Sequence, residues 1–443
     1  MYPASRNNRA NSVNSIAPAS RDAKITDTVS LRRHKPDYLI LIYTSVLMLL
    51  GLVVIYAIGP QRANVLNMAY GSEYSGSYFF IKQLLSIGLA SVAFLFMAFA
   101  PYTFITKISG WLLNIALGLC LLLAFADLFN LGIAQQTLGA TRWFNLGFLG
   151  TFQPAEFLKF AILLFLAGFL GVRAKQGKIN DKNETFIPLA IVTSIALLFI
   201  VIIQKDLGTG VAILGLILSM LFVAGISRKN LFILLVTVLI VGAIFIVSEP
   251  HRVERVLTFF KGDDVSLSDD DSYQVEHAKL AIGTGGLFGV GIGNSVQATG
   301  YLPEAINDSV FAIMGEVFGF VGLMLVLALF AGLLFRLLKI MDHTLDMRLK
   351  LIIAGVFGWL GCHIVLNIAS MTGVFPLTGI TLPLLSFGGT SMIFIAAALG
   401  LVFQFSSYTV HSSKLKEAQY ANLGSRRGLG RSRHPSFSSN SRN

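Results

Sequence analysis

Residues 317–335 read Val317-Phe-Gly-Phe-Val-Gly-Leu-Met-Leu-Val-Leu-Ala-Leu-Phe-Ala-Gly-Leu-Leu-Phe335, a run without a single charged side chain. An α-helix needs about 20 consecutive apolar residues to cross the hydrocarbon core of a bilayer. Further apolar blocks lie at 40–59, 83–100, 186–203, 207–226, 231–248 and 391–404. The sequence therefore predicts an all-α fold, that of a polytopic integral membrane protein whose core is the helix bundle itself.

The composition of the whole chain supports this class. Hydrophobic residues make up 54% of the chain and charged residues 13%, whereas soluble domains carry about 25% charged residues. The two cysteines, Cys120 and Cys362, lie within apolar runs and give neither a disulfide framework nor a metal-ligand spacing. A polar segment precedes the first apolar block, which we interpret as an uncleaved signal anchor.

We predict about ten transmembrane helices. They are placed at 38–59, 78–100, 104–126, 153–172, 186–203, 207–226, 229–248, 308–335, 351–371 and 387–408. Together they form a membrane domain over 38–408, with a large extracytoplasmic loop, 249–307, between spans seven and eight. The flanking segments 1–37 and 409–443, rich in Ser, Asn, Arg and Gly, are predicted to be disordered basic tails.

The positions of Lys and Arg set the orientation. Each tail holds seven basic residues, and cytoplasmic segments retain positive charge, so we predict that both termini are cytoplasmic. The loops 127–152, 204–206, 249–307 and 372–386 then face outward, where ATP and NAD are not available. The tails are interpreted as anchors attracted to anionic lipid, with partner binding as the alternative. Nucleic-acid binding is excluded because no folded segment accompanies the charge.

Three carboxylates lie just before the opening run, in the stretch from Tyr301 to Glu316: Glu304, Asp308 and Glu316. A carboxylate at the membrane is costly and needs a reason, which makes a functional site the default hypothesis. The alternative for Asp308 is a cap of the eighth span, a role that Asn307 or Ser309 could share.

A run of glycines over 283–293 comes earlier in the same loop. Gly285 and Gly286 are candidates for backbone contact with a diphosphate. The alternative is a turn in which two short helices pack closely. A dinucleotide fingerprint is rejected because no strand precedes the run and the run lies outside.

Charges also surround the start of the fourth span. Glu156 and Lys159 are spaced i, i+3 and share one helix face. They form either a self-satisfied ion pair or part of a functional cavity. Arg142 lies before this span, and Arg and Lys together suit a lipid-linked phosphate.

Two further outward turns carry polar residues. Lys205 and Asp206 form a short turn, in which Asp206 is either an N-cap or part of a site. The segment 373–391, which contains Ser386, is too apolar for a solvent loop and is predicted to dip into the bilayer and line a groove.

The large loop contains an acidic patch, Asp263, Asp264 and 269–271. These residues either bind a divalent cation or form a solvated acidic loop.

These segments, in this order, resemble the SEDS family (shape, elongation, division and sporulation). The matching pieces are Arg142-Trp143, Gln153-Pro-Ala-Glu156, Lys159, Asp206-Leu-Gly-Thr209, Ala281-Ile-Gly-Thr-Gly-Gly-Leu287, Leu302-Pro-Glu-Ala305, Asp308, Gly315-Glu316 and Gly379-Ile-Thr-Leu-Pro383. The chain departs from the family at Ile306, Asn307 and Ser309, beside the family's essential carboxylate, which falls on Asp308. The Gly-Ile-Thr-Leu-Pro motif and the long N-terminal tail favour the FtsW branch over the RodA branch.

The resemblance implies a peptidoglycan glycosyltransferase of the bacterial cytoplasmic membrane that polymerises lipid II at the outer face, for cell division or cell shape. It also implies a class B penicillin-binding protein as partner, alongside other divisome or elongasome proteins. The alternatives are a lipid II flippase and a non-catalytic scaffold for that penicillin-binding protein.

In the resulting hypothesis, Asp308 takes the proton of the acceptor hydroxyl during an inverting displacement of undecaprenyl diphosphate. The diphosphate would be held by Arg142, Lys159 and Lys205, or by a divalent cation, Mg²⁺ or Mn²⁺. Glu156 would orient Lys159, and Glu304 would position the substrate. The metal itself is not identified by the sequence.

Overall fold

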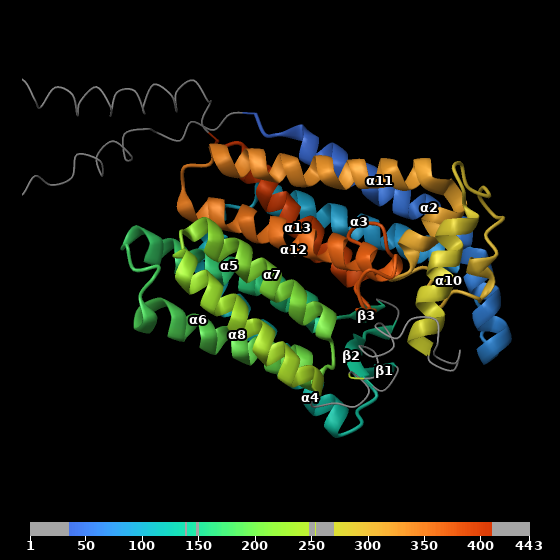
Figure 1. Ribbon diagram of the computed structural model, residues 1–443, viewed down its shortest axis with the longest axis horizontal. Coiled ribbons are helices and arrows are strands. Elements are labelled where there is room, and N and C mark those ends of the chain that lie inside the picture. The colour runs from blue at the N-terminus through green and yellow to red at the C-terminus, as the bar shows by residue number, and fades with distance from the viewer. Residues whose placement is uncertain (1–34, 138–139, 148–149, 248–252, 254–269, 410–443) are drawn as a thin grey trace, which may run out of the picture.

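The computed structural model describes residues 35–137, 140–147, 150–247, 253 and 270–409, and long helices run side by side through it (Figure 1). The helices are α2 (Tyr38–Tyr70), α3 (Tyr78–Phe99), α4 (Tyr102–Leu128), α5 (Pro154–Lys175), α6 (Ile187–Leu197), α7 (Leu207–Ala224), α8 (Arg228–Val247), α10 (Asp270–Thr284), α11 (Val310–His343), α12 (Met347–Met371) and α13 (Gly389–Ser406). Short π-helical turns, η2 (Lys182–Phe186) and η3 (Leu198–Ile203), flank α6, and η5 (Gln297–Thr299) is a 3₁₀ turn.

Nine helices within the described ranges are long and apolar enough to cross a membrane. One of them is the continuous stretch Lys182–Ile203 that contains α6. Helix α8 occupies the seventh predicted span, although its side chains at 238–246 are not described. The prediction of an all-α, polytopic membrane protein is therefore confirmed.

Two segments differ from the predicted layout. The loop predicted over 127–152 contains a three-stranded antiparallel sheet, β1 (Ala134–Thr137), β2 (Ala140–Asn145) and β3 (Thr151–Phe152), in the order β1-β2-β3. Helix α2 continues past Pro60 to Tyr70, well beyond the predicted end of its span at 59. Its added turns matter for the site, because Arg62 lies on them.

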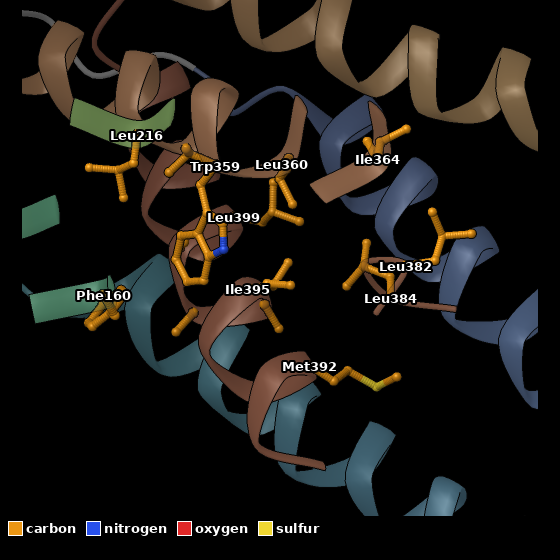
Figure 2. Packing of buried hydrophobic residues seen from close by; sticks show 14 of the residues in the cluster. Phe160, Leu216, Trp359, Leu360, Ile364, Leu382, Leu384, Met392, Ile395 and Leu399 are labelled. Carbon is orange, nitrogen blue, oxygen red and sulfur yellow. The ribbon is translucent and has the colours of Figure 1, made fainter. Parts of the chain in front are cut away.

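The core is built around α12. Trp359 is 1% exposed, and it lies among Phe160, Leu216 and Leu399 from three other helices (Figure 2). Helices α12 and α7 approach closely at Gly358, where an added Cβ would lie 2.6 Å from the carbonyl oxygen of Gly215. Small residues at such crossings let transmembrane helices pack backbone to backbone.

The apolar segment between α12 and α13 enters the bundle, as the sequence predicts. Leu382 and Leu384 belong to the same core cluster as α12 (Figure 2). An added Cβ at Gly51 of α2 would lie 2.7 Å from the carbonyl oxygen of Leu385. We call residues 372–388 the inserted loop.

Some predicted features lie outside the described residues. These are Asp263, Asp264 and Asp269 of the acidic patch, residues 1–34 of the N-terminal tail and 410–443 of the C-terminal tail.

Candidate active site

Asp308 lies in the turn that leads into α11, at the end of the bundle where α10 and the sheet are found (Figure 1). It is 7% exposed. The cap alternative is wrong for this residue, since the N-cap of α11 is Ser309. Asp308 therefore lies just outside the membrane-spanning helix, and its carboxylate is not used to cap it.

The inserted loop and α12 hold the backbone around Asp308. The Asn367 side-chain amide donates to the carbonyl oxygens of Asp308 and Ile380, both at 2.7 Å. The backbone N–H of Phe387 donates to the carbonyl oxygen of Ile306 at 2.8 Å. Asp308 is thus fixed relative to the bundle from two sides.

The surroundings of the Asp308 carboxyl disfavour its charged form. Burial, and then the nearby Glu304 carboxylate, raise the pKa of Asp308 to about 7, against the opposing effect of hydrogen bonds from backbone N–H groups and Gln274. The Oδ1 atom is buried and has no hydrogen-bond partner among the described residues. A carboxyl with a pKa near neutral is suited to general-base catalysis.

Glu304 is held by two partners. Arg62 Nη2 lies 3.8 Å from its Oε1, and the Asn307 amide donates to its Oε2. The backbone of Glu304 adopts a left-handed conformation with φ 49°, which is uncommon for residues other than glycine. The departure of the sequence at Asn307 therefore has a structural role, because its amide fixes the acidic neighbour of Asp308.

Ser309, the other unusual neighbour, connects the turn to α10. Its hydroxyl donates to the carbonyl oxygen of Pro303 and accepts from Gln274 Nε2, both at 2.9 Å. Sequence reasoning missed Gln274, since its partner lies 35 residues further along the chain.

Glu316 has a structural role. Its carboxylate accepts hydrogen bonds from the Ser295 hydroxyl, from the Val296 N–H at 2.9 Å and from the Gln297 N–H at 3.3 Å. It thereby binds the start of η5, where N–H groups lack partners within the turn.

Arg142 and Lys205 lie at the outward turn between η3 and α7. The Arg142 guanidinium, on β2, donates to the carbonyl oxygens of Gln204 at 3.2 Å and Lys205 at 2.7 Å. Asp206 caps α7 by accepting from the backbone N–H and the hydroxyl of Thr209, both at 2.9 Å. Lys205 is exposed, so this turn presents a cation at the surface.

Lys159 and Glu156 form an ion pair inside the bundle. Lys159 Nζ lies 2.7 Å from Glu156 Oε1 and 3.1 Å from His363 Nε2, and it is 5.0 Å from the centre of the Trp359 ring. Lys159 is 0% exposed, so it contacts these groups and not solvent. Sequence reasoning missed His363, although a polar pair spaced i, i+4 within a span, His363 and Asn367, is a detectable signal.

The inserted loop joins the two polar clusters. His363 Nδ1 lies 3.3 Å from the carbonyl oxygen of Thr381, next to Ile380, which Asn367 binds. In the same loop, the Ser386 hydroxyl accepts from the Leu382 N–H at 2.8 Å. Asp308 and Lys159 are thus each linked to the inserted loop by one side chain of α12, Asn367 for Asp308 and His363 for Lys159.

The glycine run packs against α11. An added Cβ at Gly285 would lie 1.9 Å from the carbonyl oxygen of Gly315, whereas Gly286 has open space around it. Backbone hydrogen bonds join Val290 to Glu316 and Phe320 to Gly286, beside the kink at Gly319. This is the close-packed turn of the sequence analysis, and diphosphate contact by Gly285 and Gly286 stays a prediction.

No group of three His, Cys, Asp or Glu side chains that could hold a metal ion is found in the described part of the chain. The divalent cation predicted at the diphosphate therefore stays a prediction, and no step below is routed through it.

Fold and site together define a multi-pass membrane protein with a buried carboxylate in a fixed turn at one end of its bundle. The chain belongs to the FtsW/RodA/SpoVE family of cell cycle proteins, whose family model matches residues 37–411. This confirms the predicted SEDS membership.

Curated relatives and solved structures agree with the assignment. The chain is 33% identical to stage V sporulation protein E of Bacillus subtilis, over 86% of this chain and 100% of the relative. It is also 33% identical to a probable peptidoglycan glycosyltransferase FtsW of Nitrosomonas europaea, over 84% and 93%. At the level of the family, the prediction of a glycosyltransferase is confirmed.

One similar structure is a chain of a peptidoglycan synthase complex that coordinates polymerization and crosslinking, with a TM-score of 0.64 and 26% identity over 84% of this chain and 97% of that one. RodA of Thermus thermophilus shares the fold, with a TM-score of 0.59 and 24% identity over 85% and 98% of the two chains.

Proposed function

We propose that this protein polymerises lipid II into glycan strands at the outer face of the cytoplasmic membrane, with both of its termini in the cytoplasm. The observation that carries the proposal is the buried Asp308 carboxyl, whose Oδ1 has no hydrogen-bond partner among the described residues and whose pKa is raised to about 7. Relatives named as peptidoglycan glycosyltransferases support it.

In the proposed step, Asp308 accepts the proton of the C4 hydroxyl of the acceptor GlcNAc. The hydroxyl oxygen forms a bond to the anomeric carbon of the donor, and undecaprenyl diphosphate leaves with the electron pair of the bond that breaks. An α-linked donor then gives a β-linked product, so one general base suffices and no covalent enzyme intermediate is needed.

Cations at the outward turn are the proposed partners of the leaving diphosphate. Arg142 and Lys205 lie there, and Arg suits phosphate through paired N–H groups. Lys159 is enclosed by Glu156 and His363, so its contact with the diphosphate requires these side chains to move. A polymerisation assay with and without a chelator tests the divalent cation.

The central test uses the full chain reconstituted with a class B penicillin-binding protein and lipid II. Asp308→Asn keeps the size of the side chain and removes the base, so strand synthesis should fall about a hundredfold or more. Glu184→Gln, at the opposite end of the bundle, is the matched control. Full strand synthesis by Asp308→Asn would remove this residue from the mechanism.

One observation favours the alternative of a lipid II flippase, namely the buried Glu156–Lys159 pair within the bundle. Ionisable residues inside a membrane often mark transport pathways. A transbilayer assay of lipid II in proteoliposomes, run without polymerisation, separates the two functions. A non-catalytic scaffold would instead keep cell function in Asp308→Asn.

A further inference from the structure

A pocket of about 230 Å³ lies between the first turns of α4 and α12. It is lined by Tyr102, Thr103, Thr106, Lys107, Asp346, Arg348 and Leu349. The C-terminal end of α12 leads into the inserted loop beside Asp308, so its first turn lies at the opposite end of the bundle. The pocket is therefore separate from the candidate active site and, in the predicted orientation, faces the cytoplasm.

The pocket carries more positive than negative charge, since Lys107 and Arg348 share it with one carboxylate, that of Asp346. Within the described residues, neither Lys107 nor Arg348 belongs to an ion pair. Arg348 Nε is buried and has no hydrogen-bond partner there, and a buried donor without a partner costs about 1–3 kcal/mol. The Asp346 carboxylate instead caps α12, accepting from the backbone N–H of Arg348 at 2.8 Å.

Helix α4 adds hydroxyl groups to the same pocket, of which the Thr106 hydroxyl already donates to the carbonyl oxygen of Thr103 at 3.1 Å. Thr103, Thr106 and Lys107 are spaced i, i+3 and i+4, so they lie on one face of the helix. The N-cap of α4 is Pro101, which makes no side-chain capping bond. The N–H groups of Phe104 and Ile105 donate to the carbonyl oxygen of Pro101, which leaves those of Tyr102 and Thr103 at the start of the helix, an arrangement that favours phosphate.

The position of Arg348 depends on a glycine of α5. An added Cβ at Gly171 would lie 2.6 Å from Arg348 Cγ, so the stem of the arginine crosses the helix where no side chain stands. Gly171→Ala would displace the arginine without changing any charge. This gives a test of the pocket's shape that is independent of its net charge.

We propose that this pocket binds a phosphate group, carried by an anionic phospholipid or by a soluble phosphate compound. Two cations without an ion pair in the described part of the chain, the Thr103 hydroxyl and an uncapped helix start form a donor set for an anion with several oxygens. Phe104 and Trp111 on α4 are 60% and 72% exposed. In the membrane these apolar side chains contact lipid, so a lipid head group can reach the pocket from the side. Basic pockets between transmembrane helices are a known setting for acidic head groups.

The test measures binding to the full-length protein in two arms. Native mass spectrometry counts retained phosphatidylglycerol against phosphatidylcholine, and calorimetry measures inorganic phosphate. Arg348→Gln and Lys107→Gln should each weaken binding about fivefold, the effect of one basic residue at an anionic surface, and Gly171→Ala should weaken it too by displacing Arg348. Lys339→Gln, exposed on α11 at the same end, is the matched control and should bind like the wild type.

Loss confined to the phosphatidylglycerol arm identifies a lipid head group as the source, and loss in the inorganic phosphate arm identifies a soluble ligand. Both results support the proposal. If all three variants melt like the wild type and retain both ligands equally, the proposal is overturned. Should Arg348→Gln fail to fold, Lys107→Gln, whose side chain is exposed, decides the result.

Discussion

Asn367 binds the backbone of Asp308 directly. Its amide donates to the carbonyl oxygen of Asp308 at 2.7 Å and, with its other N–H, to that of Ile380 at 2.7 Å. One side chain of α12 thus fixes the candidate base against the inserted loop. The geometry of the site depends on this amide as much as on the carboxylate.

Replacement of Asn367 by Leu should therefore lower catalysis more than substrate affinity. Two buried carbonyl groups lose their donor, at a cost of about 1–3 kcal/mol each in unfolding free energy. We expect a reduced kcat for strand synthesis with little change in KM for lipid II. Ser370→Ala, which removes a bond from the same helix to Pro376 of the same loop, is the control. An unchanged kcat per folded molecule would contradict this role.

The rate of strand synthesis should rise with pH between about 6 and 8. A base must be deprotonated, and a carboxyl with a pKa of about 7 is mostly protonated below that value. Glu304→Gln removes one of the groups that raise this pKa, so the rising limb should move to lower pH. The pH–rate profile of kcat checks both statements, and a limb that stays in place or moves upward would count against them.

The raised pKa of Asp308 also makes the stability of the folded protein depend on pH. The pKa of Asp308 in the folded protein, about 7, lies above its ordinary value of 3.8. The folded state therefore binds the proton more tightly, so the contribution of Asp308 to stability is full below about pH 4 and is lost as the pH rises through 7.

Local sequence patterns were enough to predict the spans and several site residues. The apolar blocks fixed the helices, and the i, i+3 spacing of Glu156 and Lys159 placed them on one face, where they form their ion pair. The missing parts depend on partners far apart in the chain. His363 lies 204 residues from Lys159, and Arg62 meets Glu304 only because α2 continues beyond Pro60.

The sheet at β1–β3 was missed for a related reason. Its strands are short, and the polar stretch that holds them resembles a loop in composition. The sheet fixes Arg142 on β2, from where it reaches the backbone of Gln204 and Lys205.

Breaking the buried Glu156–Lys159 pair should be strongly destabilising. Lys159→Met leaves the Glu156 carboxylate buried without its cation, which typically costs about 3–5 kcal/mol. Glu156→Gln leaves Lys159 with only His363 and Trp359. The double variant should recover much of this loss, because no unpaired charge remains. Unfolding in detergent of the wild type, the two single variants and the double variant measures the coupling free energy between the two side chains. If the losses of stability in the two single variants simply add in the double variant, the two side chains do not stabilise each other.

Gly285 and Gly286 should respond differently to replacement by alanine. At Gly285 the new Cβ would lie 1.9 Å from the carbonyl oxygen of Gly315, so the glycine turn would have to move away from α11. At Gly286, with φ 53° and open space, the cost is only the strain of a left-handed residue, about 1–2 kcal/mol. We expect Gly285→Ala to lower the yield of folded protein sharply and Gly286→Ala to leave most of it intact.

The yield of each variant in size-exclusion chromatography checks this prediction. The polymerisation rate of folded Gly286→Ala then tests diphosphate contact separately from folding. Equal yields for the two variants would mean that the close approach at Gly285 does not hold the turn on α11.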